Sequence, residues 1–295
     1  MPSERPAGLA FALPYLALVG GMVSLALGTS FAKQLFPLVG AEGTSTLRVG
    51  LSALILLAIW RPWRFVLSRS DAGRVLLYGV ALGLMNLSFY MSLKTIPLGL
   101  AIAIEFSGPL ALALIHSRRL IHFALIGLAV AGLALLLPVW QGVENLDPVG
   151  VFFAALAGVF WALYIIFGKR LAHRHAGQSV ALGMTVAACV IAPFGLSPAG
   201  LSLFTPHILA LGLVVAVVSS ALPYSLEMYA LKSVPKRTFG VTLSAEPAIG
   251  ALAGLVILHE QLSPAQWLAI SLIITASVGA ILTIRQDLPP AAPAT

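Results

Sequence analysis

The sequence predicts an all-α integral membrane protein of ten transmembrane helices, arranged as two inverted repeats of five helices. Three observations predict this fold: the scarcity of charge, the length and number of the apolar runs, and short matches between the two halves. Of 295 residues, 59% are apolar and 9% are charged, whereas a soluble globular domain carries about 25% charged residues. So few charges cannot solvate the surface of a chain this long, so hydrocarbon must cover much of it.

The basic balance of the chain does not indicate a nucleic-acid partner. The net charge is +7, but the Lys and Arg residues lie in short gaps between apolar runs. This distribution is typical of membrane loops and differs from a polar face with interleaved aromatic residues. The single cysteine, Cys189, excludes an intramolecular disulfide and a cysteine-based metal site. No metal or cofactor is expected.

The apolar runs are continuous, and most approach the roughly 20 residues that a helix needs to cross a bilayer. A barrel strand would instead alternate over about 10 residues. The first run follows Arg5 and resembles a signal peptide, but it exceeds a signal core of roughly 7–15 residues and contains Pro14, so we interpret it as a retained helix. In order, the predicted spans are 11–32, 43–60, 73–93, 97–117, 121–140, 149–168, 178–196, 206–230, 237–258 and 265–284.

The distribution of Lys and Arg predicts the orientation of these spans. With the N-terminus in the cytoplasm, every Lys and Arg falls on the inner side except Lys33, Lys94 and the intramembrane Arg48. The positive-inside rule therefore predicts cytoplasmic N- and C-termini and an even number of spans in a bacterial inner membrane. The proline-rich tail after Arg285 is expected to be disordered.

Short internal matches predict the repeat. Residues 93–97 (LKTIP) match residues 231–235 (LKSVP) at an offset of 138, and Pro109 matches Pro247 at the same offset. The implied halves are 1–145 and 146–295. Because each holds five spans, the second must enter the membrane upside down, as in many secondary transporters whose substrate site lies between the halves. The alternative is chance similarity between apolar segments.

Two glutamates near prolines are the strongest candidates for function inside the membrane. A charge at the bilayer centre costs at least about 2.5–3.5 kcal/mol, so each must face protein or water. Glu246 precedes Pro247, which lacks an N–H and weakens the helix locally. Glu105 has a related place before Pro109. Both are predicted to bind substrate and to couple transport to protons; the alternative is a glutamate that is hydrogen-bonded for packing.

Two further ionisable residues lie inside spans. Arg48 is predicted to pair with Glu105 or to bind a substrate carboxylate through its planar guanidinium; the alternative is snorkelling to the outer surface. Glu227 lies close to the inner end of its span, near Lys232 and Lys236. We therefore predict that Glu227 forms a structural ion pair at the membrane interface, with a functional role as the alternative.

Neutral polar and aromatic residues predict a cavity lining. Asn86 and Tyr90 are four residues apart and share one helix face, and Trp161 and Tyr164 share another. Tyr224 follows a proline in the eighth span. Such a wall suits a small amphipathic ligand, although each residue alone also fits packing.

Several stretches of the sequence together indicate a known family. They are residues 35–41 (LFPLVGA), 85–99, 105–110 (EFSGPL), 117–119 (SRR), and a block from Ala221 through Glu227 and Arg237 to Ala248. In these stretches the chain resembles the EamA-type members of the drug/metabolite transporter superfamily, and within it the bacterial inner-membrane exporters of threonine and homoserine. The resemblance extends over nearly the whole chain.

The resemblance implies the drug/metabolite transporter fold and export of small neutral amino acids, namely threonine, homoserine and analogues, by proton antiport. In this reading Arg48 meets the substrate carboxylate, and Glu105 or Glu246 meets the ammonium in competition with a proton. The expected partners are the amino acid, protons and the lipid bilayer, with a homodimer left open.

Three alternatives remain. The first is an exporter of another small metabolite or a drug-like cation, which three intramembrane glutamates would suit. The second is a membrane-embedded enzyme, which is disfavoured because the loops hold few acidic residues and no clustered metal motif. The third is a passive channel, although nothing in the sequence resembles a selectivity filter.

Overall fold

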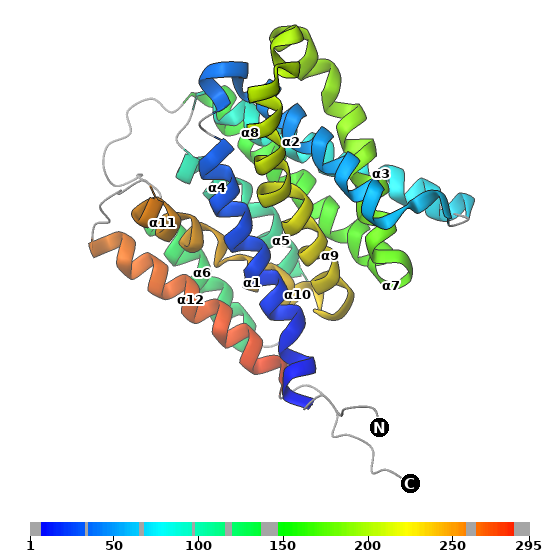
Figure 1. The fold of residues 1–295 in the computed structure, drawn as a ribbon. Coiled ribbons are helices and arrows are strands. Elements are labelled where there is room, and N and C mark those ends of the chain that lie inside the picture. The colour runs from blue at the N-terminus through cyan, green and yellow to red at the C-terminus, as the bar shows by residue number, and fades with distance from the viewer. Residues whose placement is uncertain are drawn as a thin grey trace.

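The structure is a computed structural model that describes residues 7–32, 35–64, 68–95, 98–115, 120–136, 147–257 and 264–285. Every regular element in these ranges is helical, and the helices pack side by side in one bundle (Figure 1). The predicted C-terminal tail lies outside the described residues. The helices are α1 (Ala7–Ala32), α2 (Phe36–Trp60), α3 (Arg69–Ser92), α4 (Leu98–Glu105), α5 (Ser107–Ile115), α6 (Leu120–Leu136), α7 (Pro148–Ala199), α8 (Pro206–Ala216), α9 (Leu222–Ser233), α10 (Lys236–Leu243), α11 (Glu246–Ile257) and α12 (Pro264–Arg285).

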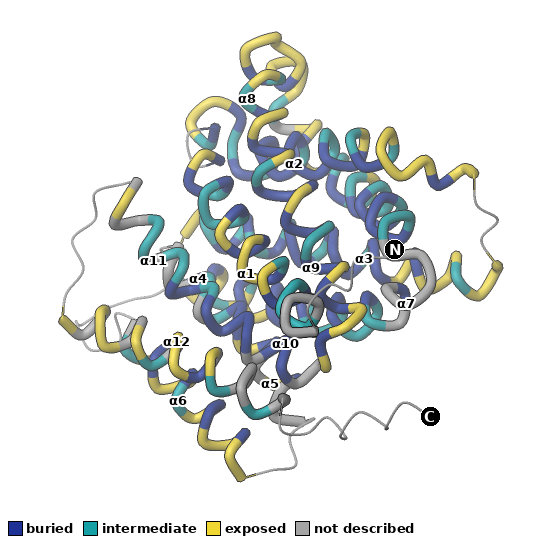
Figure 2. Tube along the Cα trace, turned by 60° about the horizontal axis from the view of Figure 1, so that its bottom comes forward, coloured by how far each residue is buried: buried dark blue, intermediate teal, exposed yellow. Residues whose placement is uncertain are grey.

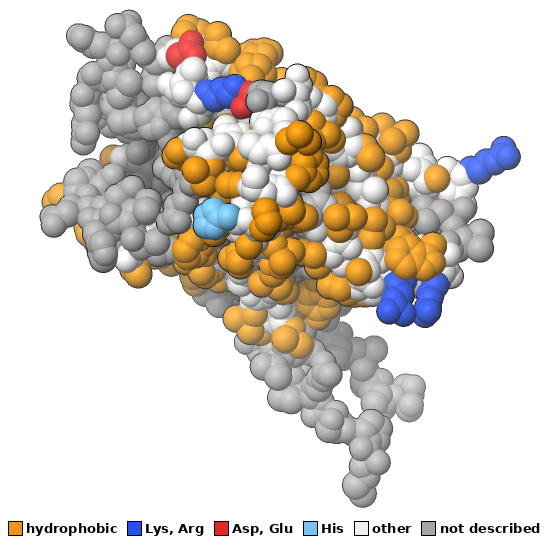
Figure 3. Space-filling view, turned by 45° about the horizontal axis from the view of Figure 1, so that its top comes forward, with side chains coloured by type: hydrophobic (Ala, Val, Ile, Leu, Met, Phe, Trp, Pro, Cys, Tyr) orange, Lys and Arg blue, Asp and Glu red, His pale blue; other side chains and the backbone are white. Residues whose placement is uncertain are grey.

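The outside of the bundle is apolar, as a lipid-facing surface requires. Leu54, Leu120 and Val256 are each more than 60% exposed. Figure 3 shows one face covered largely by hydrophobic side chains, with Lys and Arg at its two ends, most of them toward one edge. Within the described residues, six helical segments are long and apolar enough to cross a membrane. The all-helical membrane fold is therefore confirmed, whereas the count of ten crossings stays a prediction.

α7 is one uninterrupted helical run of 52 residues, yet it is bent back on itself. The ring of Tyr78 on α3 packs against both Gly168 and Gly183. In a straight helix these glycines would lie about 22 Å apart, so the run must reverse between them, as the green ribbon in Figure 1 does. The two arms cover the sixth and seventh predicted spans, 149–168 and 178–196.

The fourth and ninth predicted spans, 97–117 and 237–258, are each broken in the middle, close to the prolines that were expected to weaken them. α4 ends at Glu105 and α5 begins at Ser107; α10 ends at Leu243 and α11 begins at Glu246. Both breaks have the same cause, because Pro109 and Pro247 have no N–H to donate to the carbonyl four residues earlier. Each break therefore leaves a glutamate at a helix end inside the bundle.

The eighth predicted span contains a different irregularity. Between α8 and α9 lies a π-helical turn, η5 (Val217–Ala221), and the Ser24 hydroxyl of α1 donates to the carbonyl of Val218 over 2.6 Å. Such turns are rare and often lie near functional sites. The hydrogen bond fixes α1 against the part of the bundle that leads into α9.

Local signals explain how two of the other helices begin. Gly40, inside α2, has φ of +73°, which favours glycine, and the helix is regular only after it. Asp147 caps α7 with its side chain, which accepts a hydrogen bond of 3.1 Å from the Val149 N–H. That bond, from the helix N-terminus, lowers the pKa of Asp147, so this carboxylate is ionised at neutral pH.

The core forms where both halves of the chain meet. α1 packs along α9, α3 packs along α7, and α6 packs along α12. Figure 2 shows the buried positions on the faces that these helices turn toward one another, with exposed positions on the outside. The largest fully buried side chains include Tyr78, Tyr90, Tyr164, Phe106 and Phe239. These packed helices surround and position the site described below.

A close approach of α5 and α7 yields a stability prediction. A Cβ added to Gly108 of α5 would stand 1.8 Å from the carbonyl oxygen of Gly158 on α7. We therefore expect Gly108→Ala to destabilise the protein by at least about 1–3 kcal/mol, measured as a lower melting temperature in detergent. Gly127→Ala on α6 is the matched control, because nothing lies within 4 Å of its Cβ position. Equal melting temperatures for the two variants would contradict the close contact.

Candidate functional site

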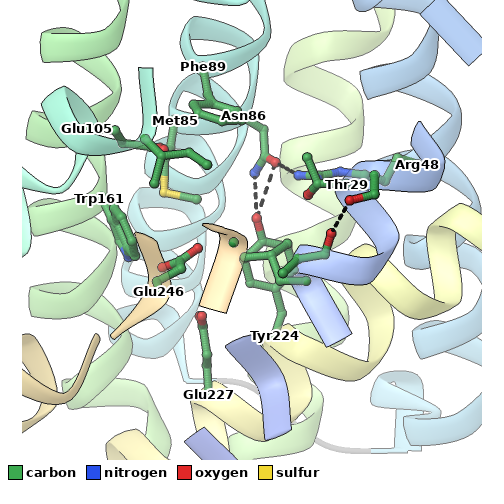
Figure 4. A pocket seen from close by; sticks show the side chains of 15 residues that line it. Thr29, Arg48, Met85, Asn86, Phe89, Glu105, Trp161, Tyr224, Glu227 and Glu246 are labelled. Atoms are coloured by element: carbon green, nitrogen blue, oxygen red, sulfur yellow. Dashed lines mark hydrogen bonds between the residues drawn. The ribbon is translucent and has the colours of Figure 1, made fainter. Parts of the chain in front are cut away.

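A cavity lies at the centre of the bundle, where helices from both halves converge (Figure 4). Its volume for the centres of water-sized groups is about 80 Å³, several times the roughly 10–15 Å³ that one water needs. It thus suits a small molecule. The lining residues are Leu25, Ala26, Thr29 and Ser30 of α1, Arg48 of α2, Met85, Asn86 and Phe89 of α3, Ile102 and Glu105 of α4, Trp161 of α7, Tyr224 and Glu227 of α9, and Glu246 and Gly250 of α11.

One side of the cavity is cationic. Arg48 is only 3% exposed, and its guanidinium donates to Asn86 Oδ1 and lies over the ring of Tyr90, 5.1 Å from the centroid. Asn86 Nδ2 donates to Leu82 O over 2.8 Å and lies 3.0 Å from the hydroxyl oxygen of Tyr224. Asn86 is therefore held in place, and Arg48 with it. Within the described chain no carboxylate comes within ion-pair distance of Arg48, and its Nε has no hydrogen-bond partner there.

The other side of the cavity is acidic. Glu105 and Glu246 reach it from the two helix breaks, and Glu227 reaches it from α9. The Tyr164 hydroxyl donates to Glu227 Oε2 over 2.7 Å. Glu246 Oε2 is buried with no hydrogen-bond partner among the described residues. Three carboxyl groups thus face a single guanidinium, and a buried carboxylate without a partner is costly.

An apolar and aromatic wall joins the two sides. Met85 and Phe89 lie one turn apart on α3 and face Trp161 across the cavity (Figure 4). Trp161 packs edge-on against Phe106, with ring centroids 6.0 Å apart. Figure 4 shows Trp161 beside Glu246 and Arg48 beyond Asn86 and Tyr224. A ligand in this space therefore meets a cation, an anion and an apolar surface together.

Six of the eight residues predicted to bind substrate line this cavity. They are Arg48, Asn86, Glu105, Trp161, Tyr224 and Glu246. The remaining two lie one layer behind it.

Tyr90 and Tyr164 support the cavity from outside. Tyr90 packs against Arg48 and against Phe36, the latter with ring centroids 5.5 Å apart. Tyr164 bonds to Glu227 and stacks on Tyr78, with ring centroids 5.2 Å apart. Both therefore contact residues that line the cavity and are not among the lining residues; their predicted part in substrate binding stays a prediction.

The interpretation of Glu227 as part of an interfacial ion pair is wrong. Its side chain is 3% exposed, faces the cavity with Tyr224 and bonds to Tyr164, whereas Lys232 is exposed. Residues 227 and 232 point about 140° apart around a helix, so nearness in sequence was misleading. The three-residue spacing of Tyr224 and Glu227 was the signal that placed Glu227 on the cavity face.

Sequence reasoning also missed the contribution of α1. Thr29 and Ser30 bring hydroxyl groups to the cavity lining, and Ser30 donates to Ala26 O over 3.0 Å. α1 is apolar on all sides, so no periodicity distinguished its inner face from its lipid face.

The arrangement fits binding better than covalent chemistry. Within the described ranges, no three His, Cys, Asp or Glu side chains are grouped so as to hold a metal ion. The cationic and acidic groups lie on different sides of the cavity, and they come from helices of both halves of the chain. Such a site can hold a small molecule that carries both charges and release it when the helices move.

Comparison with known proteins agrees with this reading. A model of the EamA-like transporter family matches residues 148–282. The chain is 47% identical to the threonine/homoserine exporter RhtA of Escherichia coli (strain K12), over 93% of each chain. It is 48% identical to the threonine/homoserine exporter RhtA of Salmonella typhimurium (strain LT2), over the same shares. A crystal structure that is 20% identical covers 94% of this chain and 99% of its own, with a TM-score of 0.68, which indicates a shared fold.

Proposed function

Because this chain belongs to the EamA-like transporter family, we propose that it is a secondary active transporter exporting threonine, homoserine and analogous small neutral amino acids from the cytoplasm. The observation that carries the proposal is the buried guanidinium of Arg48, which has no carboxylate partner in the described chain and faces three carboxyl groups across a small cavity. The relatives named for threonine and homoserine export support the substrate class.

A neutral amino acid matches these groups. Its carboxylate would receive hydrogen bonds from the planar guanidinium of Arg48, beside Tyr224. Its ammonium would lie against Glu246 or Glu105, and a short side chain would contact Met85 and Trp161. The ligand would supply the partners that the buried charges lack, so its binding offsets part of the cost of burying them.

Proton antiport follows if the ammonium and a proton compete for one carboxyl group. A protonated Glu246 or Glu105 is neutral, so it offers no negative charge to the ammonium. Binding of the amino acid would therefore release the proton, and binding of a proton would release the amino acid. Coupling then needs only one further condition: the protein must change slowly between its inward-open and outward-open states when the cavity holds neither a proton nor an amino acid. This is expected because the buried charges are then uncompensated.

The fold proposal is ten crossings in two inverted halves, 1–145 and 146–295. Three features support it: the equivalent breaks at Glu105 and Glu246, the pairing of α1 with α9 and of α3 with α7, and the contact between Asn86 and Tyr224. Residues 86 and 224 are separated by 138 positions, the offset of the sequence matches. Residues on the axis that relates two halves are expected to meet their own equivalents.

The proposed orientation has both termini in the cytoplasm of a bacterial cell. Figure 1 places the start of α1 and the end of α12 at the same end of the bundle, as an even number of crossings requires. In a Cys189→Ser background, a cysteine replacing Lys94 should react with a membrane-impermeant maleimide in intact spheroplasts. A cysteine replacing Arg64 should react only after lysis. The opposite labelling pattern would show that both termini lie outside the cytoplasm.

The function is tested in everted membrane vesicles, in which export is seen as uptake. Labelled threonine and homoserine should accumulate when a proton gradient, acidic inside, is imposed, and should not accumulate in vesicles that lack the protein. Uptake that does not depend on the proton gradient would support the substrate assignment and contradict proton antiport. Failure of both compounds, with folded protein present, would remove the substrate assignment and call for a screen of small cations.

A further inference from the structure

Glu227 is the one intramembrane carboxyl that the substrate scheme above leaves without a role. It lies on α9 one turn beyond Tyr224, toward the helix end that carries Lys232. In the proposed orientation this is the cytoplasmic side of the cavity. Figure 4 shows its side chain directed from below toward Glu246 and Tyr224.

The hydrogen bonding of Glu227 differs from that of Glu246. One oxygen of Glu227 is occupied by the Tyr164 hydroxyl over 2.7 Å, and Tyr164 is itself fixed by stacking on Tyr78 and by edge contact with Tyr224. Glu246 Oε2, by contrast, has no partner among the described residues. Glu246 is therefore free to meet a ligand, whereas Glu227 is held by the protein.

The described titratable groups around Glu227 are carboxyls and phenols. The titratable groups that interact with it are Tyr224 on its own helix, Tyr164 on α7, Tyr78 on α3, Glu105 on α4 and Glu246 on α11. α1, which packs along α9, brings Tyr15 to the same core and carries no charged residue between 11 and 32. Among the described side chains, the groups that interact with Glu227 are therefore carboxyls and phenols.

We propose that Glu227, positioned by Tyr164, accepts the proton that the substrate ammonium displaces from Glu246. The proton leaves the Glu246 carboxyl, which becomes the carboxylate that pairs with the ammonium, and binds the Glu227 carboxylate, which becomes neutral. Charge and protons balance, and no further reactant is needed. The inference rests on the proposed antiport and adds to it a second proton site on the cytoplasmic side of the substrate.

A separate proton site solves a problem of geometry in the antiport. The proton and the amino acid use the same carboxyl and move in opposite directions, so the substrate blocks the path of the proton it displaces. Glu227 lies beyond Tyr224, on the cytoplasmic side of the proposed carboxylate site. A proton that binds Glu227 can therefore leave toward the cytoplasm while the amino acid remains bound.

The test separates coupling from substrate binding in proteoliposomes. Glu227→Gln should retain exchange of labelled for unlabelled threonine, which needs no net proton movement, and should reduce gradient-driven accumulation by about 100-fold. Tyr164→Phe keeps the ring stack and removes the hydrogen-bond donor that positions Glu227. It should therefore lower gradient-driven accumulation and leave threonine exchange at the native level. Two variants serve as controls. Glu42→Gln replaces a carboxyl that is paired with Lys94 outside the cavity, and Tyr229→Phe replaces an exposed phenol on α9.

Each outcome decides between the two proposals. Normal gradient-driven accumulation by Glu227→Gln, or loss of its exchange together with its coupling, overturns the role of Glu227 and leaves the export proposal standing. Absence of exchange by the native protein removes the export proposal. In that case a substrate-free measurement decides on the proton site: the infrared difference spectrum between acidic and basic pH should contain a carboxyl band that Glu227→Gln removes, and an unchanged spectrum overturns the site.

Discussion

Arg48→Gln is expected to reduce the affinity for threonine by about 100-fold or more. Arg48 is the buried cation of the cavity, and charge-assisted hydrogen bonds of this kind contribute about 1.5–3 kcal/mol each, where 1.4 kcal/mol corresponds to a tenfold change. The planar guanidinium matters as well as the charge, so Arg48→Lys should recover only part of the loss. The measurement is threonine exchange in proteoliposomes over a range of substrate concentrations.

The fold should survive this change. Asn86 keeps its bond to Leu82 and its contact with Tyr224 when the guanidinium is removed, and the loss of a buried charge offsets the loss of its hydrogen bond. Arg64→Gln is the control, because Arg64 is exposed and follows the same helix, and its exchange should match that of the native protein. Unchanged threonine affinity in Arg48→Gln would contradict the proposal that the substrate carboxylate binds Arg48.

Glu246→Gln is expected to abolish gradient-driven accumulation and also exchange. Glutamine holds neither the proton nor the charge that the ammonium needs, and truncating one partner of a buried charge pair costs about 2–5 kcal/mol, or roughly 30-fold to several thousand-fold in affinity. This separates Glu246 from Glu227, whose replacement should spare exchange. Glu246→Asp keeps the charge on a shorter side chain and should retain part of the exchange.

Thermal unfolding keeps this second result interpretable. Because Glu246 Oε2 is buried without a partner among the described residues, replacing the carboxyl by a neutral amide should not lower the melting temperature. Added threonine should raise the melting temperature of the native protein and leave that of Glu246→Gln unchanged. Coupled accumulation at the native level in this variant would place the exchangeable charge elsewhere, with Glu105 as the next carboxyl to replace.

Much of the fold follows from the sequence, because its strongest signals are physical requirements of the bilayer. Hydrophobic runs predicted where helices lie, and the prolines at 109 and 247 marked the places where two of them break. The reversal inside α7 was expected between two spans, although its backbone stays helical through the turn. The breaks themselves were harder to predict in full, since whether a proline bends or interrupts a helix depends on the neighbouring helices.

The candidate site was predicted in part, and the reason differs from residue to residue. Arg48, Glu105 and Glu246 are costly inside a membrane, which made them visible in the sequence alone. Glu227 was misjudged because its neighbours along the chain are cationic, whereas its neighbours in space are Tyr164 and Tyr224. An aromatic residue fits a cavity wall and the layer behind it equally well, so sequence could not separate Trp161, which lines the cavity, from Tyr164, which supports it.

The contact between Asn86 and Tyr224 has a mechanical consequence if the two halves rock against each other. Rocking of this kind takes place around the substrate site between the halves, so this contact, which joins the halves at that site, would act as the fulcrum of the motion. Arg48 is bonded directly to that fulcrum, while Glu105 and Glu246 stand at helix breaks away from it. The cation would then stay at one depth in the membrane while the acidic side swings, and the substrate would pivot about its carboxylate end.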